Sequence, residues 1–300
     1  MPLTGGSALG CVAALDVGGT KIEAGVVDPR GGVLARARIP TPPDHGGVGA
    51  AQELFASAAE LLAAVIAEAS VVVDAVGVGC GGPMDASTVS PLNITQWRRF
   101  PLRAALVAEF GLPVGVDNDA KALALAEGAH GAASDVENFL AMVVSTGVGG
   151  GLVLDGRLLD GAMGNAGHIG HLVVDPQGRR CGCGGRGCLE AQVSGTAIAE
   201  ITGRPASEAD LSVRRWAGRL VGRAVGSVCN LLDLQLAVLA GSVSIGFGAP
   251  FVEAAQQELD RVARLPNCAG ARIRIGGLAA DGPLVGAACV GRLALSGTDL

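Results

Sequence analysis

The sequence predicts an α/β protein built from two related lobes. Runs rich in valine alternate along the chain with runs rich in alanine and leucine, in which apolar residues recur every three or four positions. A glycine turn with hydroxyl side chains follows a predicted strand twice, as DVGGTK from residue 16 and as STGVGGG from residue 145. A chain of 300 residues also suits two domains of ordinary size better than a single core.

The first part of the chain predicts strands joined by a hairpin and by crossover helices. Residues 11–16 (CVAALD) form a strand that enters a glycine turn, and two further strands meet at Gly31–Gly32. Residues 49–69 have apolar positions at helical spacing. The strands are predicted over 11–16, 22–28, 33–39, 71–80 and 114–117, and the helices over 49–69, 101–109 (with proline at its start) and 120–129.

The second part repeats this order of elements. Strands over 139–145 and 151–154 flank the loop TGVGG as a hairpin. A helix is predicted over 212–232, a buried strand over 236–240 that ends in Gly241–Ser242, and a final helix over 283–295. The repetition suggests two related lobes with a cleft between them.

Composition excludes several classes of protein. Hydrophobic residues make up 49% of the chain and aromatic residues only 3%, so the core must consist of alanine, valine and leucine. The 48 glycines show no collagen period and indicate tight turns and close backbone approaches. A net charge of −6 disfavours a nucleic-acid or anionic-membrane surface. No signal peptide or long apolar run is evident, so we expect a cytoplasmic protein that does not enter a membrane.

His171, Cys181, Cys183 and Cys188 are metal-ligand residue types within one glycine-rich run. Three thiolates at C-x-C-x4-C spacing with one upstream imidazole suit a closed, structural zinc site. The alternatives are free cysteines or a disulfide pair. The other cysteines lie singly in apolar surroundings and are expected to be small buried hydrophobes: Cys11, Cys80, Cys229, Cys268 and Cys289.

The first glycine turn has the chemistry of a phosphate loop. Gly18 and Gly19 allow backbone N–H groups to point at an anion, Thr20 adds a hydroxyl and Lys21 a positive charge. Asp16, at the strand end, is placed to hold a water on Mg2+. The alternative is a plain glycine hairpin.

The second turn offers Thr146 and Gly147, and the two turns could clamp a polyphosphate from both sides. Gly241–Ser242 follows a third strand and could cover a nucleoside.

Asp119 lies where a predicted strand ends and a helix begins. It is either an N-cap or a general base that takes a hydroxyl proton during phosphoryl transfer. Asn118 could orient the same substrate, whereas Asp117 is expected to face away.

Other polar residues near these motifs are candidates for sugar contacts. Glu190 follows the cysteines, and a carboxylate on a metal-fixed loop is a rigid acceptor for sugar hydroxyls. His168 and His171 are three residues apart, and only one is needed as a ligand, which leaves the other for substrate. Asn93 is a further candidate. Trp97 could stack on a sugar, but a core position is the better interpretation.

Together these motifs resemble the ROK family (repressor, open reading frame, kinase) of bacterial sugar kinases, within the actin-like/hexokinase ATPase superfamily. The similarity runs over nearly the whole chain. The matching motifs are D-x-G-G-T-K at 16–21, N-D-A at 118–120, S-T-G-V-G-G-G at 145–151, G-H at 170–171, C-x-C-G-x-x-G-C-x-E at 181–190 and the turn at Gly241–Ser242.

The resemblance implies an ATP-dependent, glucokinase-like enzyme that phosphorylates the 6-hydroxyl of a hexose. Asp119 would be the base, and His171 with the three cysteines would hold zinc. The sugar pocket would include Asn118, His168, His171, Glu190, Asn93 and Gly82. Mg-ATP would meet Asp16, Gly18, Gly19, Thr20, Lys21, Thr146, Gly147, Gly241 and Ser242.

The resemblance also implies two actin-like (ribonuclease H-like) lobes with the active site in the cleft between them. Residues 1–118 and 283–300 would form the small lobe and residues 119–282 the large lobe with the zinc loop. The partners would be a hexose and ATP, with no nucleic acid and no membrane, in a homodimer or homotetramer. Polyphosphate as the phosphoryl donor remains open.

Two departures from the family pattern concern function. Many family glucokinases have glutamate at the position of His168, whereas G-H-I-G-H at 167–171 resembles the N-acetylmannosamine kinases. An imidazole can donate a hydrogen bond where a carboxylate only accepts, so N-acetylmannosamine or another hexosamine is the alternative to glucose. Ala240 replaces a common glycine, with little expected effect.

The family's repressors carry an N-terminal helix-turn-helix, for which the stretch before Asp16 is too short. A non-catalytic sugar sensor is the remaining alternative.

Overall fold

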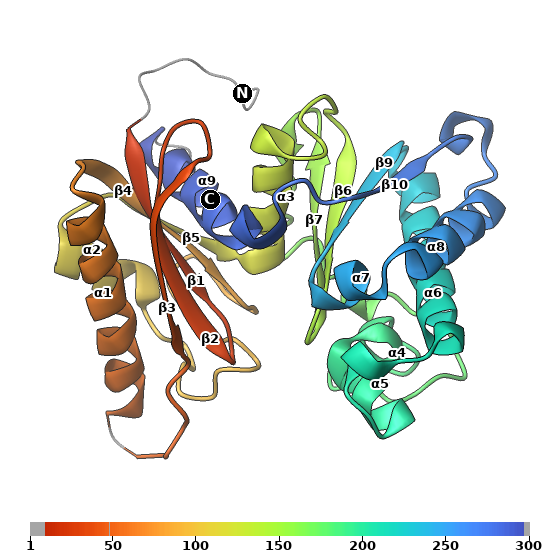
Figure 1. Cartoon of the computed structure of the whole chain (residues 1–300), viewed down its shortest axis with the longest axis horizontal. Coiled ribbons are helices and arrows are strands. Elements are labelled where there is room, and N and C mark those ends of the chain that lie inside the picture. Colours follow the sequence, from red (N-terminus) through yellow and green to blue (C-terminus); the bar gives the residue numbers. More distant parts are fainter. Residues whose placement is uncertain (1–9, 48, 297–300) are drawn as a thin grey trace. The chain divides into compact units, whose positions relative to one another are not determined.

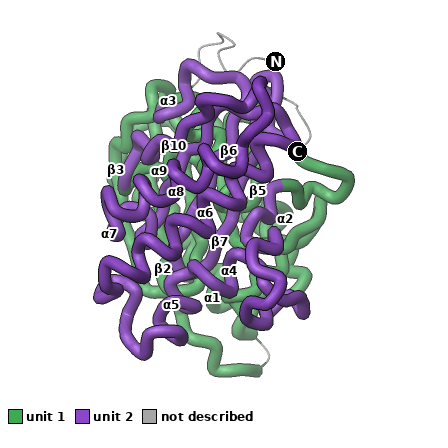
Figure 2. Tube along the Cα trace, turned by 90° about the vertical axis from the view of Figure 1, so that its right-hand side faces the viewer, with its two compact units in different colours: residues 1–130, 160–166, 280–300 green, residues 131–159, 167–279 purple. Residues whose placement is uncertain are grey.

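The computed structural model describes residues 10–47 and 49–296, which form two compact units (Figures 1 and 2). The first unit comprises the chain up to His130, the segment Asp160–Ala166 and the chain from Ala280 onward, and the second comprises Gly131–Leu159 and Gly167–Ala279. Helix α3 (Asp119–His130) packs on helix α9 (Gly282–Leu295) and so belongs to the first unit, whereas the sequence-based division starts the large lobe at residue 119.

The first unit is a five-stranded sheet in the order β3-β2-β1-β4-β5. Its β1–β2 and β2–β3 pairs are antiparallel, and its β1–β4 and β4–β5 pairs are parallel. Helices α1 and α2 cover one face, and α3 and α9 cover the other (Figure 1). The elements are β1 (Cys11–Val17), β2 (Lys21–Val27), β3 (Val33–Pro40), α1 (Ala50–Ala69), β4 (Val73–Cys80), α2 (Leu102–Phe110) and β5 (Val114–Asn118).

The second unit repeats this topology. Its sheet has the order β10-β9-β6-β7-β8, in which the β6–β7 and β7–β8 pairs are antiparallel and the β6–β9 and β9–β10 pairs are parallel. The predicted α/β class and the predicted repetition are therefore confirmed. The elements are β6 (Phe139–Val144), β7 (Val148–Leu154), β8 (Arg157–Leu158), α4 (Glu190–Val193), α5 (Gly195–Thr202), α6 (Leu211–Leu232), β9 (Leu236–Ala240), α7 (Ser242–Phe247), α8 (Ala249–Val262) and β10 (Arg272–Ile275).

Glycines let helices approach neighbouring backbones in both units. A β-carbon on Gly77 of β4 would lie 1.8 Å from the Ala287 carbonyl oxygen of α9. A β-carbon on Gly222 of α6 would lie 2.1 Å from the Ala255 carbonyl oxygen of α8. Such separations are far below van der Waals contact, so no larger residue fits without a shift of the helices. The expectation that glycines serve close backbone approaches is confirmed at these contacts.

Trp97 belongs to the core of the first unit. Its side chain is completely buried and stacks on Phe100, with the ring centroids 5.0 Å apart. Its indole N–H donates to the Ala51 carbonyl oxygen at 3.1 Å. The core interpretation is confirmed, and stacking on a sugar is excluded. Four of the five isolated cysteines are likewise buried, and Cys11 is half-buried.

Among the described residues, α1 is the one helix whose length and apolar composition would let it cross a membrane. One face of α1 supplies Leu54, Ala58, Leu62 and Val65 to the core of the first unit. Core helices of this kind meet the same length and composition criteria, so the finding is weak evidence for a membrane span.

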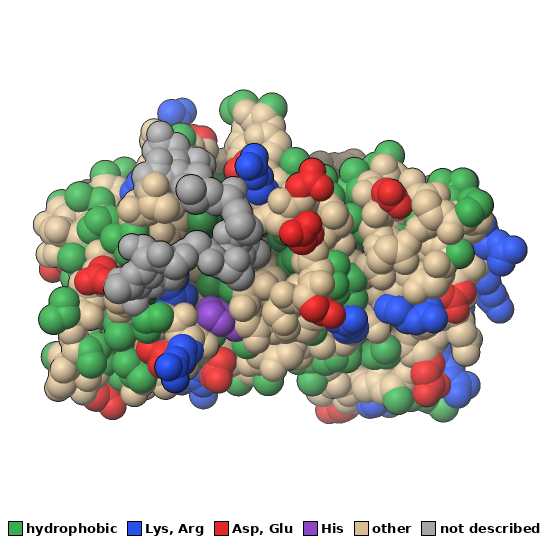
Figure 3. Space-filling view, turned by 90° about the horizontal axis from the view of Figure 1, so that it is seen from above, with side chains coloured by type: hydrophobic (Ala, Val, Ile, Leu, Met, Phe, Trp, Pro, Cys, Tyr) green, Lys and Arg blue, Asp and Glu red, His purple; other side chains and the backbone are tan. Residues whose placement is uncertain are grey.

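Charged side chains of both signs are interspersed on the face of the molecule that Figure 3 presents. No large patch of a single sign gathers on the described part of that face. This distribution agrees with the small net charge of −6.

Candidate functional site

The first unit gathers its predicted site residues at one edge of its sheet. In the parallel strands, Asp16 of β1 pairs with Gly79 of β4, and Gly79 pairs with Asp117 of β5. The carboxyl ends of these strands therefore lie side by side, which is where open α/β sheets bind ligands. At this edge, Gly82 lies in the loop after β4, Asn118 is the last residue of β5, and Asp119 is the first residue of α3.

Two carboxylates approach each other at this edge. A β-carbon on Gly79 would lie 3.8 Å from Asp16 Oδ1 and 3.7 Å from the Asp119 α-carbon. Burial raises the pKa of Asp16 to about 7, and the negative charge of Asp119 adds to the rise. An acidic pair whose charges repel each other is a site with affinity for a cation.

The turn between β1 and β2 is closed by a hydrogen bond from the Gly18 N–H to the Lys21 carbonyl oxygen at 3.0 Å. Asn93 lies against this turn, because a β-carbon on Gly19 would be 2.9 Å from Asn93 Nδ2. Lys21 Nζ is 2.6 Å from Glu23 Oε2 of β2, so a buried carboxylate holds the ammonium group. The structure thus brings Asn93 to the first glycine turn and gives Lys21 an ion-pair partner that the sequence analysis did not find.

Asp119 is the first residue of α3, and its side chain is exposed. The Ala120 N–H donates to Asn118 Oδ1 at 3.0 Å and to Asp119 Oδ1 at 2.8 Å. Asn118 therefore supplies a side-chain acceptor two residues before this N–H, as an N-cap does. The start of α3 does not depend on the Asp119 carboxylate alone.

Asp117 faces the interior, as predicted. It pairs with Lys121 at 2.9 Å, and both side chains are almost completely buried. Burial raises the pKa of Asp117, and the Lys121 charge opposes this rise. This pair was not predicted from the sequence, because Asp117 belongs to strand β5 and Lys121 to helix α3, so their spacing of four residues is not a spacing within one helix.

The second unit brings the other two predicted nucleotide turns together. The Ser145 and Ser242 hydroxyl oxygens are 3.0 Å apart, and the Gly195 N–H donates to the Ser145 carbonyl oxygen at 2.7 Å. Thr146 and Gly147 lie in the same turn, between β6 and β7. Gly241 has a φ of 98° and precedes Ser242, the first residue of α7.

The predicted loop over TGVGG is shorter than expected, because β7 already begins at Val148. A β-carbon on Gly150 would lie 2.9 Å from Ile169 Cγ2 and 3.1 Å from the Gly167 carbonyl oxygen. The prediction of a loop through residues 148–150 is therefore wrong. These strand glycines let the segment with His168 and His171 lie against β7.

His171, Cys181, Cys183 and Cys188 converge as predicted. Their ligand atoms all lie within 4.8 Å of one another. The Sγ atoms of Cys183 and Cys188 are 3.7 Å apart, and His171 Nδ1 is 3.7 Å from Cys181 Sγ. A disulfide needs about 2.05 Å between its sulfurs, whereas ligands about 2.3 Å from a tetrahedral zinc lie nearly 4 Å apart. The donor set and its spacing fit zinc.

The thiols of this group differ in acidity without a metal. The Gly185 N–H lowers the pKa of Cys183, whereas burial raises the pKa of Cys188 to about 12. A bound metal ion deprotonates such thiols because it coordinates the thiolate form.

Glu190 links this cysteine loop to the turn between β6 and β7. Its Oε2 accepts a hydrogen bond from the Val148 N–H at 2.9 Å. His168 is exposed and lies outside the four-residue group, with its ring centroid 5.9 Å from that of His171. The second unit therefore places His168 and Glu190 around the candidate metal centre.

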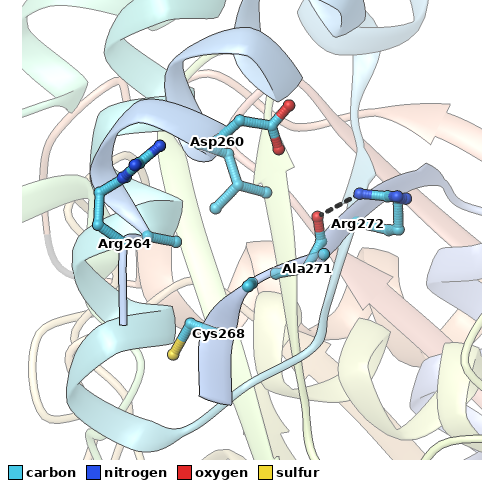
Figure 4. A pocket seen from close by; sticks show the side chains of 9 residues that line it. Asp260, Arg264, Cys268, Ala271 and Arg272 are labelled. Carbon is cyan, nitrogen blue, oxygen red and sulfur yellow. Dashed lines mark hydrogen bonds between the residues drawn. The ribbon is translucent and has the colours of Figure 1, made fainter. Parts of the chain in front are cut away.

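A separate cavity of about 430 Å3 lies between the end of α8 and β10. Asp260, Arg264 and Arg272 surround it, and the Arg272 guanidinium donates to the Ala271 carbonyl oxygen (Figure 4). None of the site residues predicted from the sequence lines this cavity.

Comparison with known proteins gives four consistent findings. The ROK family model matches residues 12–292. The chain is 38% identical over 271 residues to an N-acetylmannosamine kinase from Yersinia pseudotuberculosis, an alignment that covers 84% of this chain and 90% of the relative. It is similar in structure to a ROK hexokinase from Thermus thermophilus, with a TM-score of 0.82 and 35% identity over 96% of this chain and 99% of the other. A ROK family glucokinase from Streptomyces griseus, solved with glucose and AMPPNP, gives a TM-score of 0.81 and 29% identity over 94% and 99% of the two chains.

Proposed function

We propose, since this chain belongs to the ROK family, that it is an ATP-dependent kinase for the 6-hydroxyl of a hexose-type sugar, with N-acetylmannosamine as the preferred substrate. The observation that carries the proposal is the approach of Asp16 and Asp119 at the edge of the first sheet, with Asn118 beside them. By family, we also infer a cytoplasmic enzyme that forms a homodimer or homotetramer and needs no nucleic acid or membrane partner.

In the proposed reaction, Asp119 accepts the proton of the sugar hydroxyl, and Asn118 orients the sugar. Asp16 would hold Mg2+ through water, and the N–H groups of Gly18 and Gly19 and the Thr20 hydroxyl would bind phosphate oxygens. When bound, ATP would supply the phosphoryl group and Mg2+ would neutralise charge on it. Lys21 would add positive charge to this turn, which its contact with Glu23 moderates.

In the second unit, Thr146, Gly147, Gly241 and Ser242 would contact the nucleotide. His171, Cys181, Cys183 and Cys188 would hold a structural Zn2+. Zinc would fix the cysteine loop that leads into Glu190. The hydrogen bond from the Val148 N–H to Glu190 Oε2 would hold the Glu190 side chain in position as well. His168, His171 and Glu190 would contact the sugar, together with Asn93 and Gly82 of the first unit.

Two observations support N-acetylmannosamine. One is the 38% identity to an N-acetylmannosamine kinase over 90% of that protein. The other is His168, an exposed imidazole that can donate a hydrogen bond to an acetamido oxygen. Glucose is the second candidate, because the chain is 29% identical to a ROK family glucokinase that was solved with glucose.

We expect kcat/KM for N-acetylmannosamine to exceed that for glucose by about tenfold or more, the equivalent of one additional hydrogen bond. His168→Glu should reverse this preference, because a carboxylate cannot donate to the acetamido group. A coupled assay of ADP release with glucose, mannose, N-acetylmannosamine and N-acetylglucosamine measures both, and His130→Glu, at a histidine outside the proposed site, is the control. Measurable sugar binding without turnover of any sugar, in the ADP assay with ATP and in an assay of sugar phosphate with polyphosphate as donor, would show a sensor instead of a kinase.

The raised pKa of Asp16 predicts a defined pH dependence. Between its ordinary value of 3.8 and about 7, the folded protein holds a proton that the unfolded chain releases. The stability that protonated Asp16 contributes is therefore complete below its ordinary pKa of 3.8 and is lost as the pH rises through about 7. Mg2+ binds the ionised carboxylate, so added Mg2+ should raise the thermal midpoint more at about pH 8 than at about pH 6. Thermal unfolding of the wild type and Asp16→Asn tests this, and the variant should lose the pH-dependent part of the Mg2+ effect.

A further inference from the structure

Residues Asp160–Ala166 form a short segment that belongs to the first unit, although Leu159 before it and Gly167 after it belong to the second. We refer to these seven residues as the tie segment. It leads directly into residues 167–171, which carry His168 and His171. Its attachments within the first unit involve residues that the proposed reaction does not use.

The first attachment is a buried ammonium group. Lys121 Nζ donates to Asp160 Oδ1 at 2.7 Å and to the Gly164 carbonyl oxygen at 3.2 Å, and it lies 2.9 Å from Asp117 Oδ1. The side chain of Lys121 is 3% exposed and that of Asp160 is 43% exposed. A buried lysine must be paired to stay charged, and the two aspartates provide that pairing.

The second attachment is made by Asn165. Its Nδ2 donates to the Met84 carbonyl oxygen at 2.9 Å, and its Oδ1 accepts from the Met84 N–H at 3.4 Å. Met84 follows Gly82 by two residues, and Lys121 follows Asp119 by two residues. The tie segment is thus bonded next to the loop after β4 and next to the junction of β5 and α3, both of which carry proposed sugar ligands.

We propose that Lys121 and Asp160 are positioning residues for sugar binding, because their ion pair fixes the tie segment beside the loop of Gly82 and the junction of β5 and α3 at Asn118–Asp119. This inference rests on the proposed kinase function. Both places carry proposed sugar ligands, whereas among the described residues of the first unit the Gly18 turn proposed for ATP makes no hydrogen bond to the tie segment. Loss of the pair should therefore affect the sugar more than the nucleotide.

Asp160→Ala tests the proposal, because it removes the half-exposed partner and leaves the buried Lys121–Asp117 pair intact. Lys121→Met is less suitable, since it leaves the buried Asp117 carboxylate with the Asn118 N–H but without a positive charge beside it. Asp160→Ala should raise the KM for the sugar by about tenfold and leave the KM for ATP unchanged. A change of this size is expected when the groups that position a substrate are slightly displaced. Asp160→Glu keeps the charge and should restore the sugar KM.

Asp135→Ala is the matched control, because it breaks the exposed ion pair with Arg274 at 3.1 Å, within the second unit. It should leave both KM values unchanged. An Asp160→Ala enzyme with a lower thermal midpoint but a wild-type sugar KM would overturn the positioning role, as would equal increases in both KM values. The wild-type rate tests the kinase function and the ratio of variant to wild-type KM tests the positioning role, so the two can fail separately.

Discussion

Replacement of Asp119 by asparagine is expected to lower kcat by about 10²–10⁴-fold while sugar binding persists. Asparagine has nearly the same shape but cannot accept the proton of the sugar hydroxyl. The fold should tolerate the change, because Asn118 Oδ1 also accepts from the Ala120 N–H at the start of α3. Steady-state kinetics give kcat, and calorimetric titration with the sugar gives the affinity.

A second readout distinguishes a lost base from general damage. The charge of Asp119 contributes to the raised pKa of Asp16, so Asp119→Asn should lower the pKa of Asp16. The pH at which Mg2+ begins to stabilise the protein should shift downward accordingly. Asp210→Asn makes the same substitution at the start of α6, where Asp210 is the N-cap, and should leave kcat unchanged. A near-normal rate for Asp119→Asn would show that another group is the base.

Removal of one thiolate from the candidate zinc centre should have the second large effect. Cys188→Ala is expected to release the metal, lower the thermal midpoint and raise the sugar KM by about tenfold, the loss of roughly one hydrogen bond to the sugar. The reason is that binding of a structural metal contributes directly to folding free energy, and the cysteine loop leads into Glu190. Elemental analysis of the purified protein and sugar kinetics measure these changes.

Cys229→Ala is the matched control, since Cys229 is an equally buried thiol of the second unit that lies outside the four-residue group. It should retain one zinc per chain and a wild-type sugar KM. Two results would contradict the prediction: wild-type protein that contains no zinc, or chelated protein with unchanged sugar affinity.

Much of this molecule is predictable from local patterns. The spacing of Cys181, Cys183 and Cys188 predicted their convergence with His171, because the pattern is typical of zinc ligands and the glycines between them permit the tight turns that convergence requires. The two glycine turns predicted a repeated unit, and the matching strand orders confirm it. Helix α8 could also have been predicted from the sequence, since Phe251, Ala255 and Leu259 recur every four residues and are buried.

Other features depend on tertiary contacts that no local pattern contains. Strand β10 reads Arg-Ile-Arg-Ile at a sheet edge and is largely exposed, and an alternation over only four residues is too short to mark a strand by itself. The partnership of Lys121 with Asp160 joins residues 39 positions apart. The glycines of β7 were assigned to a loop. They are needed in the strand because residues 167–170 lie close against it, and that contact comes from another part of the chain.

Helix α9 has a consequence for synthesis on the ribosome. The strands β1, β4 and β5 are made early, yet the face that bears Gly77 is covered by Gly282–Leu295. Until those residues emerge, the nascent first unit exposes an apolar sheet face, while the second unit can already form its core. We therefore expect the second unit to fold first although its sequence comes later, with the first unit dependent on chaperones or on slow long-range pairing.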